Sequence, residues 1–169
     1  ARERACDKGI TVEWVEDDMR RFRRPGAFDL VLSLFTSFGY FDDPRDDARV
    51  IRNIHDNLVP GGACIMDLMG REVLARKYGP IFVETLPDGR RKLDIPRIVD
   101  DWTAVESEWI LIDGDKVRTF AFRLRLYSGS ELRKLFIDKG FVDVSLFGDL
   151  EGGEYGPEAT RLVLMARWG

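Results

Sequence analysis

Small polar residues and one phenol follow a strongly apolar stretch in the first third of the chain. In "FDLVLSLFTSFGYF", residues 28–41, the run Leu30–Leu32 gives way to Thr36, Ser37, Gly39 and Tyr40. Hydroxyl oxygens and an aromatic face attract a cation or an amine, so this segment suits a site that handles positive charge. The alternative is a plain turn after a strand, in which Gly39 supplies an unusual φ angle.

The composition excludes several classes of function. The 169 residues carry a formal net charge of −4, which leaves no basic footprint for nucleic acid or an anionic membrane. No apolar run approaches the roughly 20 residues of a membrane-spanning helix, and no stretch has the pattern of a signal peptide. We therefore expect a cytoplasmic protein with a single domain over residues 1–169.

Cysteine and histidine offer little chemistry. Cys6 and Cys64 lack the spacing of metal ligands and do not make a disulfide framework, so no metal site is predicted. His55, the single histidine, lies within a predicted helix, where packing or solvent contact is favoured over chemistry.

The candidate site is embedded in an alternation of strands and helices. The predicted elements are strands over 11–16, 27–35 and 63–69 and a helix over 43–58. Asp43 suits the N-cap of that helix and Pro44 its first position, and "PGG" ends it. The order strand, strand, helix, strand is typical of a parallel α/β sheet.

The pattern changes after Gly70. A short helix over 71–78 and a Pro/Gly-marked loop precede three alternating, aromatic-rich strands, at about 91–101, 103–112 and 117–127. Asp113-Gly114 is a hairpin turn signal between the last two, so an antiparallel insert over 71–127 is predicted. A capping box of Ser128 and Glu131 then begins a helix that Gly140 ends. Strands over 141–149 and 159–168 complete the chain.

Five stretches, in order and spacing, resemble the later motifs of class I S-adenosylmethionine-dependent methyltransferases. They are VEDDMRRF (15–22), FDLVLSLFTSFGYF (28–41), NLVPGGACIMDL (57–68), YSGSELRKLFIDKGFVDV (127–144) and RLVLMAR (161–167). The resemblance implies a Rossmann-like, doubly wound α/β sheet, with the antiparallel insert between strands 5 and 6. Small-molecule N-methyltransferases resembling glycine and sugar-amine methyltransferases share the pattern at the end of the fourth strand.

The resemblance also implies which residues bind S-adenosyl-L-methionine. Asp18 would accept a hydrogen bond from the exocyclic amine of the adenine, and the Met19 backbone N–H would donate to a ring nitrogen. Leu34 would offer its backbone carbonyl to the amino group of the cofactor. These positions follow strands at the edge where open α/β sheets bind ligands. The alternative for Asp18 is a helix N-cap or an acid in a solvated turn.

The acceptor side is implied in the same way. Ser37 and Tyr40 would face the methyl sulfonium, with Tyr40 as the catalytic candidate that orients the acceptor or receives its proton. Tyr127, just before the capped helix, is the second candidate. Methyl transfer depends mainly on alignment, so no firm general base is assigned. The insert would form a wall or lid of the acceptor pocket, or alternatively a contact in a homodimer.

The sequence departs from the family at its start. The Gly-rich loop after the first strand, and the acidic residue that ends the second, have no counterpart in these residues, and "ARERACDKG" has the pattern of a helix closed by Gly9. We expect an N-terminally truncated domain that binds the cofactor weakly or not at all, from a protein that methylates a small-molecule acceptor, with an amine preferred. A non-catalytic binding module and a nucleotide-dependent oxidoreductase remain alternatives.

The absence of counterparts to the first two strands of the family also predicts an unfilled gap in the sheet. In the family sheet order 3-2-1-4-5-7-6, the strand at Thr11–Val15 is the third and the strand at Phe28–Phe35 the fourth, so two strands should stand between them. An unfilled gap would expose Leu30, Leu32 and Ile65 and leave ladder groups unpaired. We expect further strands there, from additional residues or a partner chain, or else direct pairing of Thr11–Val15 with Phe28–Phe35.

Overall fold

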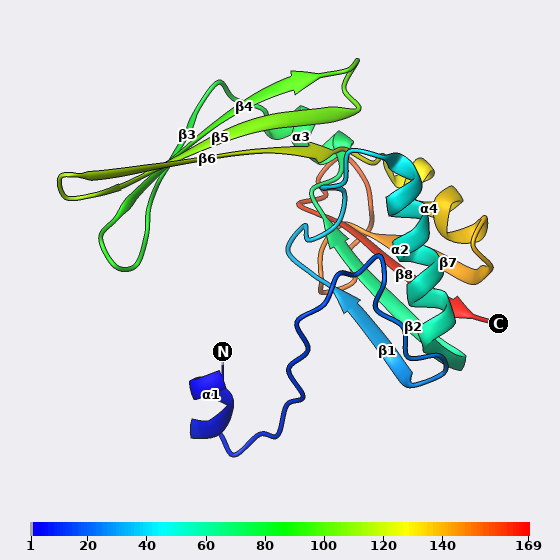
Figure 1. The fold of residues 1–169 in the computed structure, drawn as a ribbon. Coiled ribbons are helices and arrows are strands. Elements are labelled where there is room, and N and C mark those ends of the chain that lie inside the picture. The colour runs from blue at the N-terminus through cyan, green and yellow to red at the C-terminus, as the bar shows by residue number, and fades with distance from the viewer. Residues whose placement is uncertain (1) are drawn as a thin grey trace.

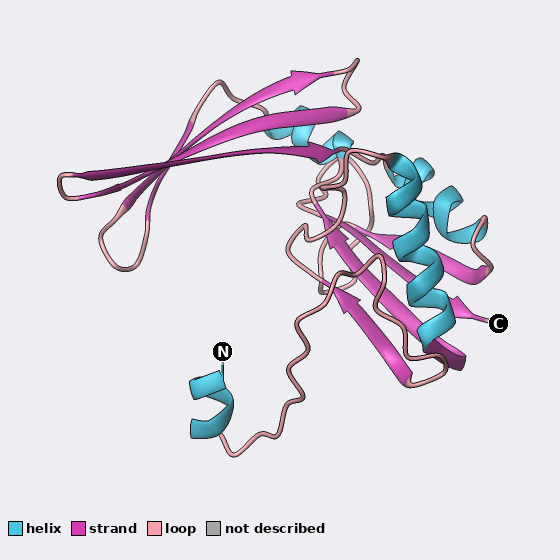
Figure 2. Ribbon diagram, viewed as in Figure 1, coloured by secondary structure: helices cyan, strands magenta, loops and turns pink. Residues whose placement is uncertain are grey.

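The computed structural model describes residues 2–169 and contains two separate four-stranded sheets (Figures 1 and 2). The elements in chain order are α1 (Arg2–Asp7), β1 (Phe28–Ser33), α2 (Pro44–Asn57), β2 (Leu58–Leu68), α3 (Arg71–Lys77), β3 (Phe82–Thr85), β4 (Arg91–Val99), β5 (Ala104–Asp113), β6 (Lys116–Arg125), α4 (Gly129–Ile137), β7 (Phe141–Phe147) and β8 (Leu162–Trp168).

The first sheet has the order β1-β2-β8-β7. β1 and β2 are parallel, whereas β8 runs antiparallel to both β2 and β7. This is the expected order 4-5-7-6, and the predicted α/β fold class is confirmed. Helices α2 and α4 lie on the same face of the sheet (Figure 1), and the main core is packed between them and the strands. Its fully buried members include Phe38, Ile51, Leu58, Met66, Leu132, Phe136, Leu162 and Leu164.

Local signals set the ends of the two helices as predicted. The Asp43 side chain accepts the Arg45 N–H at 2.9 Å, and Pro44 opens α2. Ser128 and Glu131 form both halves of the capping box at the start of α4. Such caps satisfy backbone groups that a helix end leaves unpaired.

The second sheet is the predicted antiparallel insert, in the order β3-β4-β5-β6. It extends away from the first sheet (Figure 1), and most of it is exposed or half-buried. At its base Val105 and Leu124, with Leu126 just beyond β6, form a small buried cluster. β3 was expected to be loop. All four of its residues are exposed, so it lacks the apolar and polar alternation by which a half-buried strand is recognised.

The strand predicted over 11–16 is wrong, because residues 10–18 are irregular. β propensity produces a strand only where a neighbouring strand is there to pair with, and this segment makes no ladder with β1. Its ties are local instead: Glu13 pairs with Arg24, and the Arg2 guanidinium lies 5.6 Å from the Trp14 ring centroid. Direct pairing of Thr11–Val15 with Phe28–Phe35 is therefore also wrong.

β1 is consequently an edge strand with one uncovered face. Leu30 and Leu32 are 48% and 53% exposed, whereas Val31, which points to the opposite face, packs against the main core. Ile65 on the adjacent strand is partly covered. The exposure expected for an unfilled edge is thus present at the two leucines.

The remaining polar candidates of the sequence lie in ordinary surroundings. His55 packs between Phe141 and Trp168, with ring centroids 5.3 Å and 5.1 Å away. Burial raises the pKa of the Cys64 thiol to about 12, whereas Cys6 is exposed. Residues 2–169 contain no group of three or more His, Cys, Asp or Glu placed to hold a metal. No helix in this range has the length and apolar character to cross a membrane.

Candidate functional site

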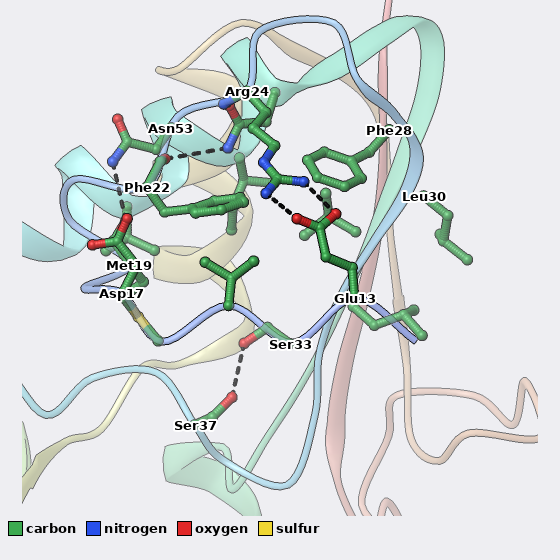
Figure 3. A pocket seen from close by; sticks show the side chains of 16 residues that line it. Glu13, Asp17, Met19, Phe22, Arg24, Phe28, Leu30, Ser33, Ser37 and Asn53 are labelled. Atoms are coloured by element: carbon green, nitrogen blue, oxygen red, sulfur yellow. Dashed lines mark hydrogen bonds and ion pairs between the residues drawn. The ribbon is translucent and has the colours of Figure 1, made fainter. Parts of the chain in front are cut away.

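A cavity of about 550 Å³ lies along the outer edge of β1 (Figure 3). Its walls come from the segment 13–24, from β1 with Ser37 beyond it, and from one side of α2. Most wall residues are apolar, and an ion pair closes one side, with Glu13 Oε2 2.6 Å from Arg24 Nη1. An apolar hollow with a few polar groups is the usual form of a small-molecule site.

Two buried asparagines of α2 fasten the segment that forms the cavity wall. Asn53 Nδ2 donates to the Met19 carbonyl at 3.0 Å. Asn57 Oδ1 accepts the Arg24 N–H at 2.6 Å, and Asn57 Nδ2 donates to the Phe22 carbonyl at 3.3 Å. Since unpaired buried backbone groups are costly, these amides give an otherwise irregular segment a defined path across α2.

Asp18 is held by its neighbour rather than directed into the cavity. Its carboxylate receives the Arg20 backbone N–H at 2.9 Å and the Arg20 guanidinium at 2.6 to 3.0 Å. The same guanidinium reaches Asp46 at 3.1 Å and lies 4.7 Å from the Phe41 ring centroid. The hydrogen bonds from Arg20 lower the pKa of Asp18 to about 2. Asp17 and Met19, on either side of it, do line the cavity.

The turn after β1 contains two successive non-glycine residues in the left-handed conformation. Phe35 and Thr36 both have φ 56°, which costs on the order of 1–2 kcal/mol per residue. The Phe35 N–H donates to Asp67 Oδ2 and the Thr36 N–H to the Asp67 carbonyl, both at 3.0 Å. Asp67 is buried and is the penultimate residue of β2, so a buried carboxylate of the adjacent strand fixes this turn.

Arg161, just before β8, completes that arrangement. Its Nε donates to Asp67 Oδ1 at 2.6 Å, and its Nη2 donates to Thr36 Oγ1 at 3.0 Å. Thr36 Oγ1 also accepts the Met69 N–H at 3.0 Å. Three separate parts of the chain therefore meet at one point beyond the carboxyl ends of β1 and β2.

The segment Leu34–Tyr40 connects the cavity with the insert. Ser37 lines the cavity, and its hydroxyl lies 3.1 Å from that of Ser33. The Tyr40 ring lies 5.8 Å from Phe122 of β6, which in turn lies 5.0 Å from Trp109 of β5. Burial raises the pKa of Tyr40, so its phenol is neutral at pH 7.

Tyr127 is directed into the interior between α2 and the insert. Its hydroxyl donates to Asp47 Oδ2 at 2.7 Å, and Arg125 Nε donates to the same oxygen at 2.9 Å. Asp47 is completely buried, and burial raises its pKa despite these partners. Burial and the Asp47 carboxylate both raise the pKa of Tyr127. This tyrosine links the insert to α2.

The structure thus brings together only some of the predicted site residues. Met19 and Ser37 line one cavity, and Leu34 lies half-buried at the end of β1. Asp18, Tyr40 and Tyr127 are not among the cavity-lining residues: the first is bound to Arg20, the second packs on the insert, and the third is bound to Asp47.

Sequence reasoning missed Asn53, Asp67 and Arg161. One signal was available for Asp67, since it is an acidic residue within the otherwise apolar "ACIMDLM", and a buried charge needs a partner. Nothing in the sequence points to Arg161 as that partner, because 94 positions separate the two.

S-adenosyl-L-methionine, the cofactor implied by the motifs, fits these surroundings in part. The apolar walls and the Ser37 hydroxyl suit a planar base with a polar tail. Asp18 fits less well, because Arg20 already donates to both of its oxygens. Asp17 lines the cavity, and its Oδ1 accepts the Asp18 N–H at 2.7 Å.

Comparison with known proteins supports the same fold. The family model of a methyltransferase domain matches residues 1–62. Among curated proteins none matches this chain. A solved S-adenosylmethionine-dependent methyltransferase from Clostridium acetobutylicum superposes with a TM-score of 0.82 at 16% identity, covering 99% of this chain and 69% of that one.

Two further solved structures have the same architecture. The CcbJ methyltransferase from Streptomyces caelestis gives a TM-score of 0.79 at 17% identity, over 99% of this chain and 69% of that one. The sugar N-methyltransferase KedS8 from Streptoalloteichus gives 0.67 at 20% identity, over 98% and 66%. The resemblance drawn from the sequence motifs is therefore confirmed, and the chain has the fold of the class I S-adenosylmethionine-dependent methyltransferases.

Proposed function

We propose that the protein carrying this chain transfers a methyl group from S-adenosyl-L-methionine to a small-molecule amine. One observation carries the proposal: the segment Leu34–Tyr40 begins at the carboxyl end of β1, contributes Ser37 to the cavity and has the Tyr40 ring beside that of Phe122 in the insert. A cofactor in the cavity and an acceptor under the insert would then meet along this segment. Ligands of open α/β sheets bind at such strand ends.

S-adenosyl-L-methionine would supply an electrophilic methyl group on a sulfonium. Met19 and the apolar walls would enclose the adenosine, and the Leu34 carbonyl would accept from the amino group of the cofactor. We assign the hydrogen bond from the adenine amine to Asp17, because it lines the cavity, and assign Asp18 to holding Arg20. Arg20 then ties this segment to α2 through Asp46.

The acceptor side rests on Tyr40 and the insert. The acceptor nitrogen would form its bond to the methyl carbon as the carbon–sulfur bond breaks, and the methylated ammonium would lose its proton to water. Since burial keeps the Tyr40 phenol neutral, it would orient the acceptor by a hydrogen bond rather than act as a base at pH 7. An amine acceptor is supported by the similarity in fold to a sugar N-methyltransferase.

Calorimetry of cofactor binding tests the proposal, in the longest natural form of the protein. Asp17→Ala should weaken binding roughly five- to thirty-fold, the loss of one hydrogen bond to a buried ligand, whereas Asp18→Ala should have the smaller effect. Failure of the wild type to bind S-adenosyl-L-methionine would refute the proposed function. A larger effect at Asp18 would reverse the assignment of the two carboxylates.

Measurements of kcat distinguish the role proposed for Tyr40 from that of the residues proposed to bind the cofactor. With an amine acceptor identified by screening, Tyr40→Phe should lower kcat while leaving the affinity for S-adenosyl-L-methionine unchanged. Phe122→Leu serves as a control for packing against the ring, since it leaves the hydroxyl in place. Equal losses of kcat and cofactor affinity in Tyr40→Phe would exclude the acceptor role.

A further inference from the structure

The most exposed large apolar side chain within residues 2–169 is Phe35, at 82%. It lies two residues beyond the end of β1, between Leu34 and the left-handed residue Thr36, and its own backbone is also left-handed. Exposing a phenyl ring to water is unfavourable, and a bulky residue in this backbone region is rare. Phe35 therefore combines an exposed apolar ring with an unfavourable backbone conformation.

Neighbouring side chains hold the backbone of Phe35 in this unfavourable conformation. Asp67 accepts the backbone N–H of Phe35, and Arg161 pairs with Asp67 while also donating to Thr36. Both charged side chains are largely withdrawn from water, at 2% exposure for Asp67 and 26% for Arg161. Strained backbone that the surrounding structure holds in place in this way is characteristic of functional sites.

We propose that Phe35 is a further cofactor-binding residue, whose ring contacts the positively charged end of S-adenosyl-L-methionine, and that Asp67 and Arg161 are positioning residues that hold it there. This inference rests on the proposed function. The ring of phenylalanine carries negative charge density on its face and attracts a cation. Phe35 is not among the cavity-lining residues, but Ser37, two residues further on in the same turn, is one of them. The proposal therefore places the sulfonium at the end of the cavity nearest this turn.

The charge of the ligand gives a direct test. S-adenosyl-L-methionine is a sulfonium cation, whereas the demethylated product, S-adenosyl-L-homocysteine, is a neutral thioether with otherwise the same groups. A ring that acts through its charge distribution discriminates between the two. A ring that merely packs against adenosine does not.

Calorimetry with both ligands should be performed on Phe35→Leu, in the longest natural form of the protein. We expect the Kd for S-adenosyl-L-methionine to rise roughly three- to thirty-fold and that for S-adenosyl-L-homocysteine to change less than about two-fold. Phe35→Tyr, which keeps the ring, should restore the preference. Phe120→Leu, at an exposed ring of the insert, is the matched control and should alter neither Kd.

Asp67→Asn tests the positioning pair. It removes the charge that holds Arg161 and should shift the ratio of the two affinities in the same direction as Phe35→Leu. Asp29→Asn, at an exposed position of β1, controls for the lost negative charge. If Asp67→Asn does not fold, Phe35→Leu decides alone, because an exposed side chain is not needed for folding.

The outcomes separate this inference from the proposed function. If the wild type binds both ligands and Phe35→Leu changes neither affinity, or weakens both equally, the charge-selective role is overturned while the proposed function stands. If the wild type binds neither ligand, both fail.

Discussion

The two sheets of this chain are stabilised in different ways. The α/β sheet packs thirteen buried apolar residues between its strands and the helices α2 and α4. The insert has a cluster of three, Val105, Leu124 and Leu126, confined to the base of the sheet. Beyond that base the insert relies on backbone ladders, on exposed ion pairs such as Lys92 with Glu84, and on the contact between the rings of Trp109 and Phe122.

This difference in packing indicates which part of the molecule sets the geometry of the site and which part can vary. Tight packing leaves side chains few alternatives, so the strand ends of the α/β sheet are fixed. The insert joins this body through a few polar contacts, including the Arg125 N–H to the Gly39 carbonyl at 2.8 Å and Arg125 to Asp47. Under the proposed function, the fixed part would bind the cofactor and the less packed part would determine the acceptor.

The largest expected effect tests the difference in packing directly. Phe136→Ala removes a completely buried ring that lies 5.0 Å from the ring of Phe141, and should lower the free energy of unfolding by about 3–5 kcal/mol. Phe120→Ala removes a ring of the insert that is 51% exposed, and should cost less than about 1 kcal/mol. Urea denaturation followed by circular dichroism measures both. Similar losses for the two variants would contradict the contrast between the sheets.

Local chemistry made the helices and most strands predictable from the sequence. The cap at Asp43, the capping box at Ser128 and the Asp113-Gly114 turn each act within a few residues, and each appears in the structure. The segment 11–16 failed because a strand also needs a neighbour, which alternation alone does not supply. β3 was missed because both of its faces are exposed.

The site was less predictable than the fold for a related reason. Ser37 was recognised as a polar residue beyond a strand end, and Asp18 was assigned through the family resemblance after a predicted strand that does not form. The sequence could not show that Arg20 binds Asp18. The arrangement of Asp67, Arg161 and Thr36 joins residues up to 125 positions apart. Such long-range contacts follow from the sheet order. The periodic pattern of apolar and polar residues in the sequence does not show which side chains these contacts bring together.

An intermediate effect is expected at the joint between the sheets. Gly39 has φ +102°, and an added Cβ would lie 2.9 Å from the Arg125 carbonyl oxygen. Gly39→Ala should therefore cost about 1–3 kcal/mol and loosen the attachment of β6. Gly26→Ala is the matched control, since Gly26 has φ +60° but open space around it. Urea denaturation gives the stability, and limited proteolysis of the insert reports the attachment. If Gly39→Ala costs no more than Gly26→Ala, the close approach to Arg125 has no energetic importance.

The smallest effect is expected for the exposed ion pairs of the insert. Arg123 donates to Glu106 at 3.0 Å and also pairs with Asp100, and all three side chains are more than a third exposed. Water and salt screen such pairs, and ordering the long side chains offsets part of the attraction. Arg123→Ala should therefore lower Tm by less than about 3 °C at low ionic strength, with the difference shrinking in 1 M salt.

Arg118→Ala, at an exposed position on the same strand, controls for the loss of a positive charge. A drop in Tm as large as that of Phe136→Ala, shrinking in 1 M salt, would mean that ion pairs stabilise the insert as strongly as buried rings stabilise the α/β sheet. A loss that salt does not change would show that Arg123 stabilises the insert by some contact other than its ion pairs.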